Sequence, residues 1–361
     1  MNRKGLALLS LMLATGLPIS LSAEQNHVIV VSGLGGAQEY RDRFYEWSIR
    51  LVDAAIDRHG IPADQVVFLA EQPDRDPDRI RARSTWENIQ TAITEVAEHA
   101  AFDDLVLIVL IGHGSFSGSV SHFNLPGPDP TVVDFAVALN ELRDQQVVFV
   151  NTATASGEFI AGLSGPKRTI ITATKTARER NETKFGEFFV EAFAGRVGPE
   201  FETPTATNSV KGIAIDDVAD ANKDGRVSLL EAFDYTRRQV ARVYEESGLL
   251  LTEHAMLDDN GDGYGSDEPD PLTAGADGRI AQALFFTPSG RLTTAELETD
   301  DPTLMRLYAE RNAIEKRVLA HRTLRDGMDS AIYEQELERL LIDLALKNRE
   351  IRKAEDGAPQ P

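Results

Sequence analysis

The sequence predicts an α/β protein whose sheet is mainly parallel and covered by helices on both faces. Between residues 27 and 195, short continuous apolar runs alternate with segments whose apolar residues recur at helical spacing. Continuous apolar runs, rather than runs of alternating polarity, are typical of strands buried on both faces of a parallel sheet. The composition of the 361 residues, 42% hydrophobic and 26% charged, is sufficient for a large core.

The strands and helices of this region follow one another in regular order. Buried strands are expected at residues 27–33, 65–71, 105–111, 147–151 and 168–174. Helices are expected at residues 38–58, 84–100, 131–142 and 184–193. The helix at 84–100 is predicted to begin with a capping box, in which Ser84 is the N-cap and Glu87 lies three residues later.

The pattern changes after about residue 195. Residues 200–290 are rich in Asp, Gly and Thr and contain one strongly predicted helix, at residues 228–246. Residues 302–354 carry two charged helices joined at Asp326–Gly327, which predicts a helical hairpin. The second helix has an apolar seam made of Leu337, Leu340, Leu341, Leu344 and Ile351. This seam favours packing of the hairpin on its own core over recruitment of a partner.

The first residues resemble a secretory signal peptide that ends near Ala23. They combine a basic start, an apolar stretch interrupted by Gly16 and Pro18, and small residues near the cleavage point. We therefore expect an exported protein, either periplasmic or secreted. The chain has no cysteine, so it has neither a lipid-attachment cysteine nor a disulfide. No later segment is apolar over the length that a membrane span requires.

The acidic charge narrows the classes of partner. Lys and Arg number 37 against 58 Asp and Glu, which gives a net charge of -21. Such a surface disfavours nucleic acid and anionic membranes as partners, and it favours solubility and cation binding. A soluble acidic protein without any such partner would show the same balance.

Two neighbouring strands of the predicted sheet end in polar residues. His113 stands between glycines after the strand at 105–111, and the segment from Thr152 to Gly157 follows the next strand. Reactive groups collect at the carboxyl ends of parallel strands, and imidazole is suited to proton transfer near neutral pH. Gly114 would let a backbone N–H approach a developing oxyanion. These residues predict a functional site; the alternative is a tolerated loop histidine.

Residues 27–195 resemble the legumain family of caspase-like cysteine peptidases. In that family a strand ends in His-Gly, and the next ends in an Ala-Cys-x-Ser-Gly segment that carries the nucleophile. Here the second segment is Ala-Thr-Ala-Ser-Gly, so Ala153, Ser156 and Gly157 match while Thr154 replaces the cysteine. The resemblance implies a caspase-like, three-layer fold and a site made of His113, Gly114 and Thr154.

The resemblance extends to the loop after the first strand. The family has an Asn-Tyr-Arg segment there, which Tyr40 and Arg41 match, while Glu39 replaces the asparagine. The family's arginine lines a pocket for an Asn or Asp side chain. The resemblance therefore implies a substrate-binding role for Arg41 and a peptide or protein as the ligand.

The missing cysteine determines the expected chemistry. A thiolate is a competent nucleophile near neutral pH, whereas a threonine hydroxyl needs a much stronger base and its methyl group crowds the attack. Ser156 has a hydroxyl but the wrong position in the motif. We expect a legumain-like protein that has lost peptidase activity; the alternative is an active peptidase or acyl hydrolase that uses Thr154 and His113.

A calcium loop is predicted at residues 220–231. An EF-hand loop needs oxygen ligands at positions 1, 3, 5, 9 and 12, a backbone carbonyl at position 7 and glycine at position 6. The helix at 228–246 follows the loop directly, as in an EF-hand or dockerin-like half. The predicted Ca²⁺ ligands are Asp220, Asn222, Asp224, Arg226 through its carbonyl, Ser228 and Glu231, with Gly225 at the turn.

A second loop repeats the pattern less completely. Asp258, Asn260 and Asp262 occupy positions 1, 3 and 5, and Gly263 occupies the turn. Position 12 is a proline, so closure of a metal shell would need Asp267, Glu268 or Asp270. Metal binding and a plain acidic turn fit this loop equally.

The expected organisation has four parts. They are a signal peptide at 1–23, a caspase-like domain at 24–199, an EF-hand-like calcium-binding segment at 200–290, and a helical hairpin with its tail at 291–361.

Overall fold

The computed structural model describes residues 25–285 except 103, 205–208, 217 and 223–225, then scattered residues between 303 and 321, and residues 330–357. The predicted signal peptide lies outside these ranges. Within them, no helix has the length and apolar character needed to cross a membrane.

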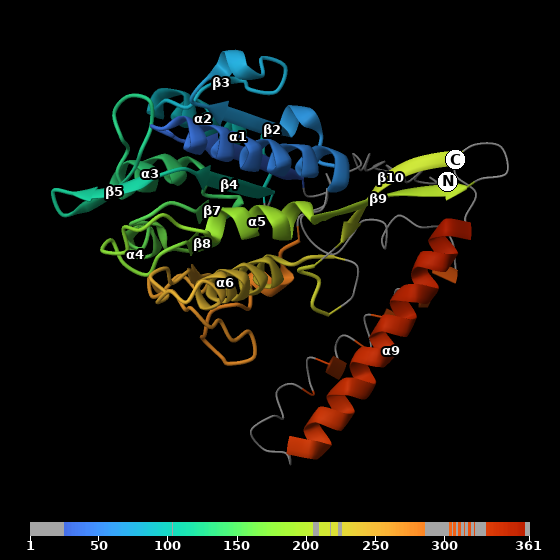
Figure 1. Ribbon diagram of the computed structural model, residues 1–361. Helices are drawn as coiled ribbons and strands as arrows, with labels where there is room; N and C mark the ends of the chain where they lie inside the picture. Colours follow the sequence, from blue (N-terminus) through green and yellow to red (C-terminus); the bar gives the residue numbers. More distant parts are fainter. Residues whose placement is uncertain are drawn as a thin grey trace, which may run out of the picture.

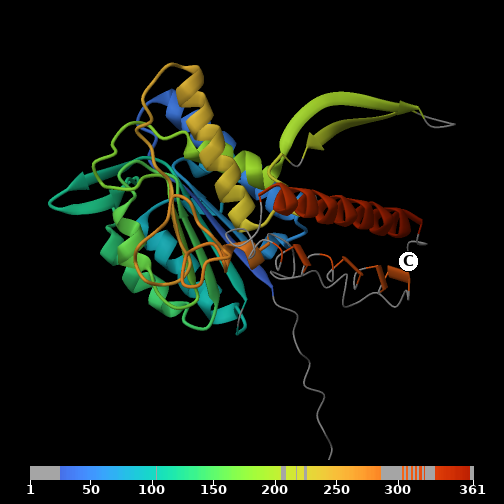
Figure 2. The ribbon, with the colours of Figure 1, turned by 90° about the horizontal axis from the view of Figure 1, so that it is seen from below.

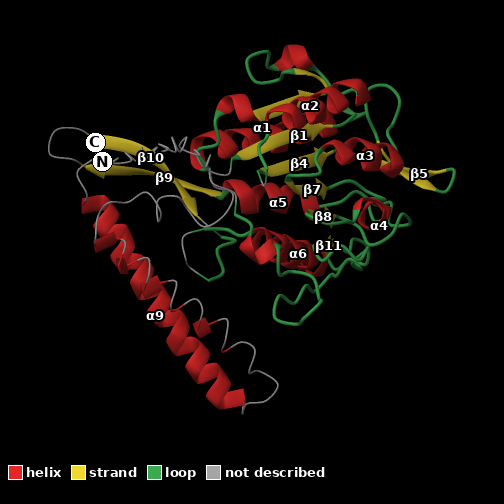
Figure 3. Ribbon diagram, turned by 180° about the vertical axis from the view of Figure 1, so that it is seen from behind, coloured by secondary structure: helices red, strands yellow, loops and turns green. Residues whose placement is uncertain are grey.

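A seven-stranded sheet in the order β11-β8-β7-β4-β1-β2-β3 forms the centre of the molecule (Figures 1 and 3). All neighbouring strands pair in parallel except β11, which pairs antiparallel with β8. The strands are β1 (Asn26–Ser32), β2 (Val66–Ala70), β3 (Ala82–Arg83), β4 (Leu105–Ile111), β7 (Gln146–Asn151), β8 (Arg168–Thr172) and β11 (Met256–Asp258). Their residues from Val28 to Val31 and Val106 to Ile111 are at most 2% exposed, as strands covered on both faces should be.

Helices cover both faces of this sheet and give the fold three layers. One apolar core joins it to α1 (Gln38–Asp53), α5 (Phe185–Ala194) and α6 (Leu229–Glu246). A second core, on the other face, joins it to α2 (Trp86–His99), α3 (Val132–Ala138) and α4 (Glu158–Leu163). The predicted α/β class with a mainly parallel sheet is therefore confirmed.

Short elements complete the domain. One turn of π-helix, η1 (Ala54–Arg58), extends α1 to the end predicted for it. The hairpin of β5 (Gly114–Ser117) and β6 (Val120–Phe123) follows β4 and forms a separate two-stranded sheet. The short helical turns are η2 (Ala63–Gln65), η3 (Pro73–Arg75), η4 (Leu139–Glu141) and η5 (Ala281–Ala283).

The segment predicted as a calcium-binding unit contributes to the same core. Helix α6 packs against α5, where Phe185 and Phe233 lie 6.4 Å apart between ring centroids. Residues Met256–Asp258 add β11 to the edge of the sheet. The two regions that composition separates therefore share one hydrophobic interior.

The predicted N-cap of α2 was wrong by one residue. The hydroxyl of Thr85, not of Ser84, accepts a hydrogen bond from the backbone N–H of Asn88 at 3.3 Å. Ser84 is fully buried, and its own N–H donates to the carbonyl of Ala70 at 2.9 Å. This bond holds Ser84 against the end of β2, so the helix begins one residue later.

Two elements extend beyond the α/β body (Figures 1 and 2). One is the antiparallel ribbon of β9 (Arg196–Pro204) and β10 (Ser209–Asp216). The other is the C-terminal helix α9 (Ser330–Gly357). Leu304 and Leu307 cluster with Ile351 of α9, and Leu340 and Leu344 are buried. The predicted hairpin turn at Asp326–Gly327 lies outside the described residues. Leu337 and Leu341 are only half-buried and line a groove on another side of α9.

Candidate functional site

The two polar segments singled out in the sequence lie at one edge of the sheet. Strands β4 and β7 pair in parallel, with Leu110 opposite Asn151. His113 follows the end of β4, and Thr154 follows the end of β7. Parallel neighbours end at the same edge, so the fold itself brings the two segments together.

The hydroxyl of Thr154 is engaged with the backbone of Gly114. It donates a hydrogen bond to the Gly114 carbonyl at 2.8 Å and accepts one from the Gly114 N–H at 3.2 Å. Thr154 is only 7% exposed. Within the described part of the chain, no hydrogen bond joins this hydroxyl to His113. A hydroxyl that donates its proton to a carbonyl has no base to activate it.

Gly114 is required here by the close approach of the two strand tips. A Cβ at this position would lie 2.1 Å from the carbonyl oxygen of Thr154, where no side chain fits. Its N–H points to the Thr154 hydroxyl instead of to open space. The expected oxyanion-binding N–H is therefore already occupied, and packing explains the glycine.

The imidazole of His113 lies against the first helix. Its ring makes edge-on contacts with Tyr40 and Phe44 of α1, at centroid distances of 4.6 and 4.9 Å. Burial lowers the pKa of His113 below its ordinary 6.5, and the nearby guanidinium of Arg43 acts in the same direction, while Glu182 opposes both. The imidazole is therefore neutral at pH 7.

Glu182 connects α1 to the loop after β8, residues 173–184. It accepts a hydrogen bond from the Tyr40 hydroxyl at 3.2 Å and pairs with the guanidinium of Arg43. Because Tyr40 also contacts His113, this carboxylate belongs to the wall of the same site. Nothing in the sequence pattern separates Glu182 from the other charges of its loop.

Glu179 connects the same loop to the segment that carries Thr154. Its carbonyl accepts the N–H of Ala155 at 2.9 Å, and its carboxylate accepts the N–H groups of Lys175 and His254, both at 3.1 Å. Ala155 has φ +54°, a conformation that costs a non-glycine residue about 1 kcal/mol and needs support from its neighbours. The segment after β7 is therefore held in place from outside.

The hydroxyl of Ser156, the second hydroxyl of the Ala-Thr-Ala-Ser-Gly segment, is not available to a ligand either. Ser156 is 1% exposed, and its hydroxyl lies 3.1 Å from that of Thr174 and accepts the Thr174 N–H at 3.3 Å. It therefore stabilises the loop after β8 and faces no ligand.

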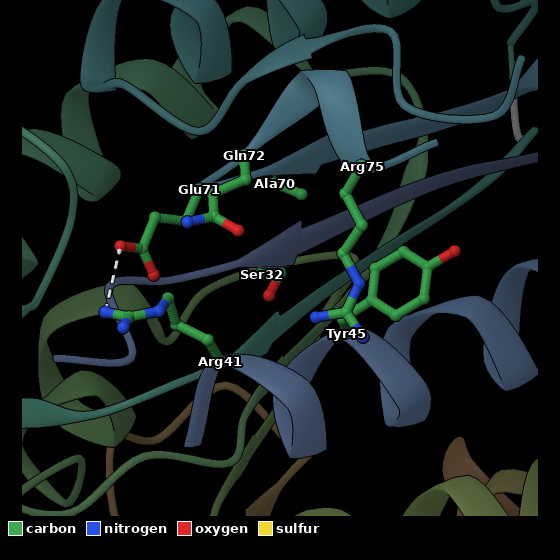
Figure 4. Close-up of a pocket in the computed structure, with 7 residues that line it drawn as sticks. All are labelled: Ser32, Arg41, Tyr45, Ala70, Glu71, Gln72 and Arg75. Atoms are coloured by element: carbon green, nitrogen blue, oxygen red, sulfur yellow. Dashed lines mark ion pairs between the residues drawn. The ribbon is translucent and has the colours of Figure 1, made fainter. Parts of the chain in front are cut away.

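Arg41 lines a separate pocket at the carboxyl ends of β1 and β2. The other lining residues are Ser32, Tyr45, Ala70, Glu71, Gln72 and Arg75. Figure 4 shows the guanidinium of Arg41 turned toward Glu71 and that of Arg75 over the ring of Tyr45. The Arg41 guanidinium lies 4.0 Å from a carboxylate oxygen of Glu71, and the Arg75 guanidinium carbon lies 3.9 Å from the centroid of the Tyr45 ring. Arg41 also donates to the Gly36 carbonyl at 2.6 Å. Neither His113 nor Thr154 lines this pocket, and sequence reasoning missed Arg75 and Tyr45.

The first predicted calcium loop is partly described, and Asp224 lies outside the described residues. Glu231, at position 12, turns back over the loop. Its carboxylate accepts the N–H groups of Ala221 and Asn222, both at 3.2 Å, and forms a capping box with Ser228 at the start of α6. Asp220, at position 1, is 5% exposed. The side chain of Arg226 lies over the ring of Phe285, at 4.4 Å.

The side chains of the second predicted calcium loop accept hydrogen bonds within local turns. Asp258 accepts the N–H groups of Gly261 and Gly263, both at 3.0 Å, and Asn260 and Asp262 accept N–H groups two residues ahead, both at 2.8 Å. The proposed closing residues point elsewhere: Glu268 pairs with Arg237 at 3.2 Å, and Asp270 accepts the N–H of Leu272 at 3.0 Å. Across the described residues, no three acidic or histidine side chains are arranged to hold a metal ion.

Asp277 is the buried carboxylate that the sequence did not indicate. It is 4% exposed and accepts the N–H of Asp259 at 3.1 Å. Burial, together with the charges of Asp258 and Asp259, raises its pKa to about 6. It lies eight residues beyond Pro269, position 12 of the expected loop, so no EF-hand spacing could locate it.

Comparisons with known proteins were made at the levels of sequence and fold. No protein-family model matches the chain, and a search of curated proteins found no match. Protein GSU0716 from Geobacter sulfurreducens is similar in structure, with 9% sequence identity and a TM-score of 0.42, over 74% of this chain and 100% of that one. Caspase-1 from Spodoptera frugiperda matches with 13% identity and a TM-score of 0.31, over 54% of this chain and 87% of that one.

Proposed function

We propose that this is an exported, legumain-like protein of caspase-like fold that binds peptide segments at the strand tips without hydrolysing them. The motif residues carry the likeness: His113 and Thr154 follow adjacent parallel strands in the order the family has. The half-buried imidazole, with Tyr40 and Glu182 beside it, supports a site that still presents groups to a ligand.

The observation that carries the loss of activity is the hydrogen bond from the Thr154 hydroxyl to the Gly114 carbonyl. Attack on a peptide bond needs a base to take the hydroxyl proton, and the neutral imidazole of His113 shares no hydrogen bond with Thr154 in the described structure. The Gly114 N–H is also taken. The hydroxyl that would be the nucleophile and the N–H that would bind the oxyanion are therefore hydrogen-bonded to each other.

A peptide library tests this proposal on the purified chain without its signal peptide. We expect binding of a subset of peptides and no cleavage after Asn, Asp or any other residue. Cleavage by the wild-type protein that Thr154→Ala abolishes would establish the hydrolase and refute the proposal. Absence of binding to every peptide would refute it as well.

We also propose that the loop at residues 220–231 binds Ca²⁺ and stabilises the fold. Asp220, Asn222, Asp224, the Arg226 carbonyl, Ser228 and Glu231 would hold the ion, which would supply rigidity. The carboxylate of Glu231, directed from position 12 to the backbone of positions 2 and 3, supports this assignment. For Asp258, Asn260 and Asp262, the proline at position 12 and the pairing of Glu268 and Asp270 with other groups favour the plain acidic turn over a metal site.

A further inference from the structure

The loop between α6 and β11, residues 247–255, borders the strand-tip site. It lies beside the loop after β8: Asn181 donates to the hydroxyl of Thr252 at 2.9 Å, and the N–H of His254 donates to Glu179 at 3.1 Å. The carboxylate of Glu253 accepts two N–H groups at the start of α5, those of Lys184 at 2.8 Å and Phe185 at 2.7 Å.

These bonds fix the position of three consecutive leucines. Leu249, Leu250 and Leu251 precede Thr252 and are 64%, 87% and 39% exposed. Single exposed leucines are ordinary, but a contiguous group on an ordered loop marks an interaction surface. Thr252 follows Leu251 and bonds to Asn181, next to Glu182 of the site wall, so the loop that carries the leucines borders that site.

Unpaired cations accompany these leucines. Arg178 and Arg180, on the loop after β8, are exposed, and neither forms an ion pair with any residue that the structure describes. The Arg180 guanidinium lies 5.8 Å from the centroid of the Phe116 ring on the β5–β6 hairpin.

We propose that Leu249–Leu251 with Arg178 and Arg180 form a docking surface for a peptide segment that carries both acidic and leucine-sized apolar side chains. This inference rests on the proposed function, because the surface would extend the peptide-binding site outward. The leucines gain from burial, and the arginines are matched by carboxylates. The acidic charge elsewhere repels such a segment only within a Debye length of about 8 to 10 Å. Local charge complementarity therefore decides where it binds.

Three short fluorescent peptides test the surface by anisotropy with the full mature chain. One alternates Asp and Leu, the second has Lys in place of Asp, and the third has Ser in place of Leu. We expect the Asp–Leu peptide to bind at least about tenfold more tightly than the other two, a difference of about 1.4 kcal/mol. Its affinity should fall as NaCl is raised. Equal or tighter binding of the Lys–Leu peptide would overturn the proposal.

Paired variants locate the binding. Leu250→Ser with Leu251→Ser, and separately Arg178→Ala with Arg180→Ala, should each weaken the Asp–Leu peptide about tenfold or more. Val137→Ser, at a residue 63% exposed on α3, and Arg143→Ala are the matched controls and should change nothing. Binding unchanged in both pairs of variants would contradict the docking surface.

Two further outcomes separate this inference from the proposed function. If His113→Ala abolishes peptide binding while the docking-surface variants bind normally, the peptide site stands and the docking surface is wrong. If Leu250→Ser instead converts a dimer to a monomer in sedimentation, the occupant is a second copy of the chain and the proposal is wrong.

Discussion

At the scale of single residues, the hydroxyl of Thr154 has a structural role. It is 7% exposed and satisfies both the N–H and the carbonyl of Gly114. A buried polar group that loses its partner costs about 1 to 3 kcal/mol. The Thr154 hydroxyl thus joins the two strand tips.

Thr154→Val should therefore destabilise the protein by about 1 to 3 kcal/mol, because Gly114 loses both hydrogen bonds while the side-chain volume is kept. Thr154→Ser, which keeps the hydroxyl, should cost less. Urea unfolding measures both. The control is Thr91→Val on α2, where an exposed threonine donates to the Glu87 carbonyl at 3.0 Å. Equal loss in the two valine variants would show that the Gly114 contact is unimportant.

Glu253 makes stability depend on pH. Burial raises its pKa to about 7, against the hydrogen bonds from Lys184 and Phe185 that lower it. Its folded-state pKa lies above its ordinary 4.5, so its contribution to stability is fully present below pH 4.5 and is lost as the pH rises through 7.

Glu253→Gln should remove this part of the pH dependence. At pH 8 the variant avoids a buried charge, so its free energy of unfolding should fall less between pH 5 and pH 8 than that of the wild type, by about 2 kcal/mol. Urea unfolding at the two pH values measures this. Glu98→Gln, at an exposed glutamate of α2, is the control. A wild-type difference that persists unchanged in Glu253→Gln would exclude Glu253 as its cause.

At the scale of elements, the carboxyl ends of β4 and β7 approach so closely that only glycine fits at position 114. Gly114→Ala would place a methyl carbon 2.1 Å from the Thr154 carbonyl oxygen. Relief requires movement of the backbone, so we expect a cost of about 3 kcal/mol or more in thermal or urea unfolding. Gly165→Ala is the control, because its added carbon would lie 3.9 Å from its nearest neighbour, in the flexible side chain of Arg168. A stable Gly114→Ala variant would contradict this packing.

Among the elements, burial on both faces decides which strands the sequence can predict. Strands such as β1 and β4 are buried on both faces, so their continuous apolar runs identify them directly. Strand β11 has three residues, and pairing with β8 rather than its own pattern makes it a strand. The same contrast separates the site residues that the sequence indicates from those that it does not. His113 and Thr154 follow strands in the sequence, whereas Glu179 and Glu253 act through contacts 24 or more positions away that no local spacing encodes.

At the scale of the whole molecule, the chain has a net charge of -21 and no cysteine, so the proposed calcium ion would supply the rigidity that disulfides supply elsewhere. The loop at residues 220–231 leads into α6, which carries Leu229, Leu230 and Phe233 into the core shared with α5 and the sheet. A bound ion that holds this loop rigid would therefore also hold α6 in its packed position beside α5 and the sheet.

Calcium should raise the melting temperature of the mature chain. An ion that binds only the folded state adds about 2.7 kcal/mol to stability at a hundredfold excess over its Kd. Asp220, Asp224 and Glu231 also repel one another without it. Glu231→Gln retains a side chain that can cap α6 but removes one charge and weakens bidentate closure, so the calcium-induced rise should shrink. Glu268→Gln, at a residue paired with Arg237, is the control and should keep the full rise. Differential scanning calorimetry with calcium and with chelator measures this, and identical wild-type melting curves in the two would reduce the loop to a turn.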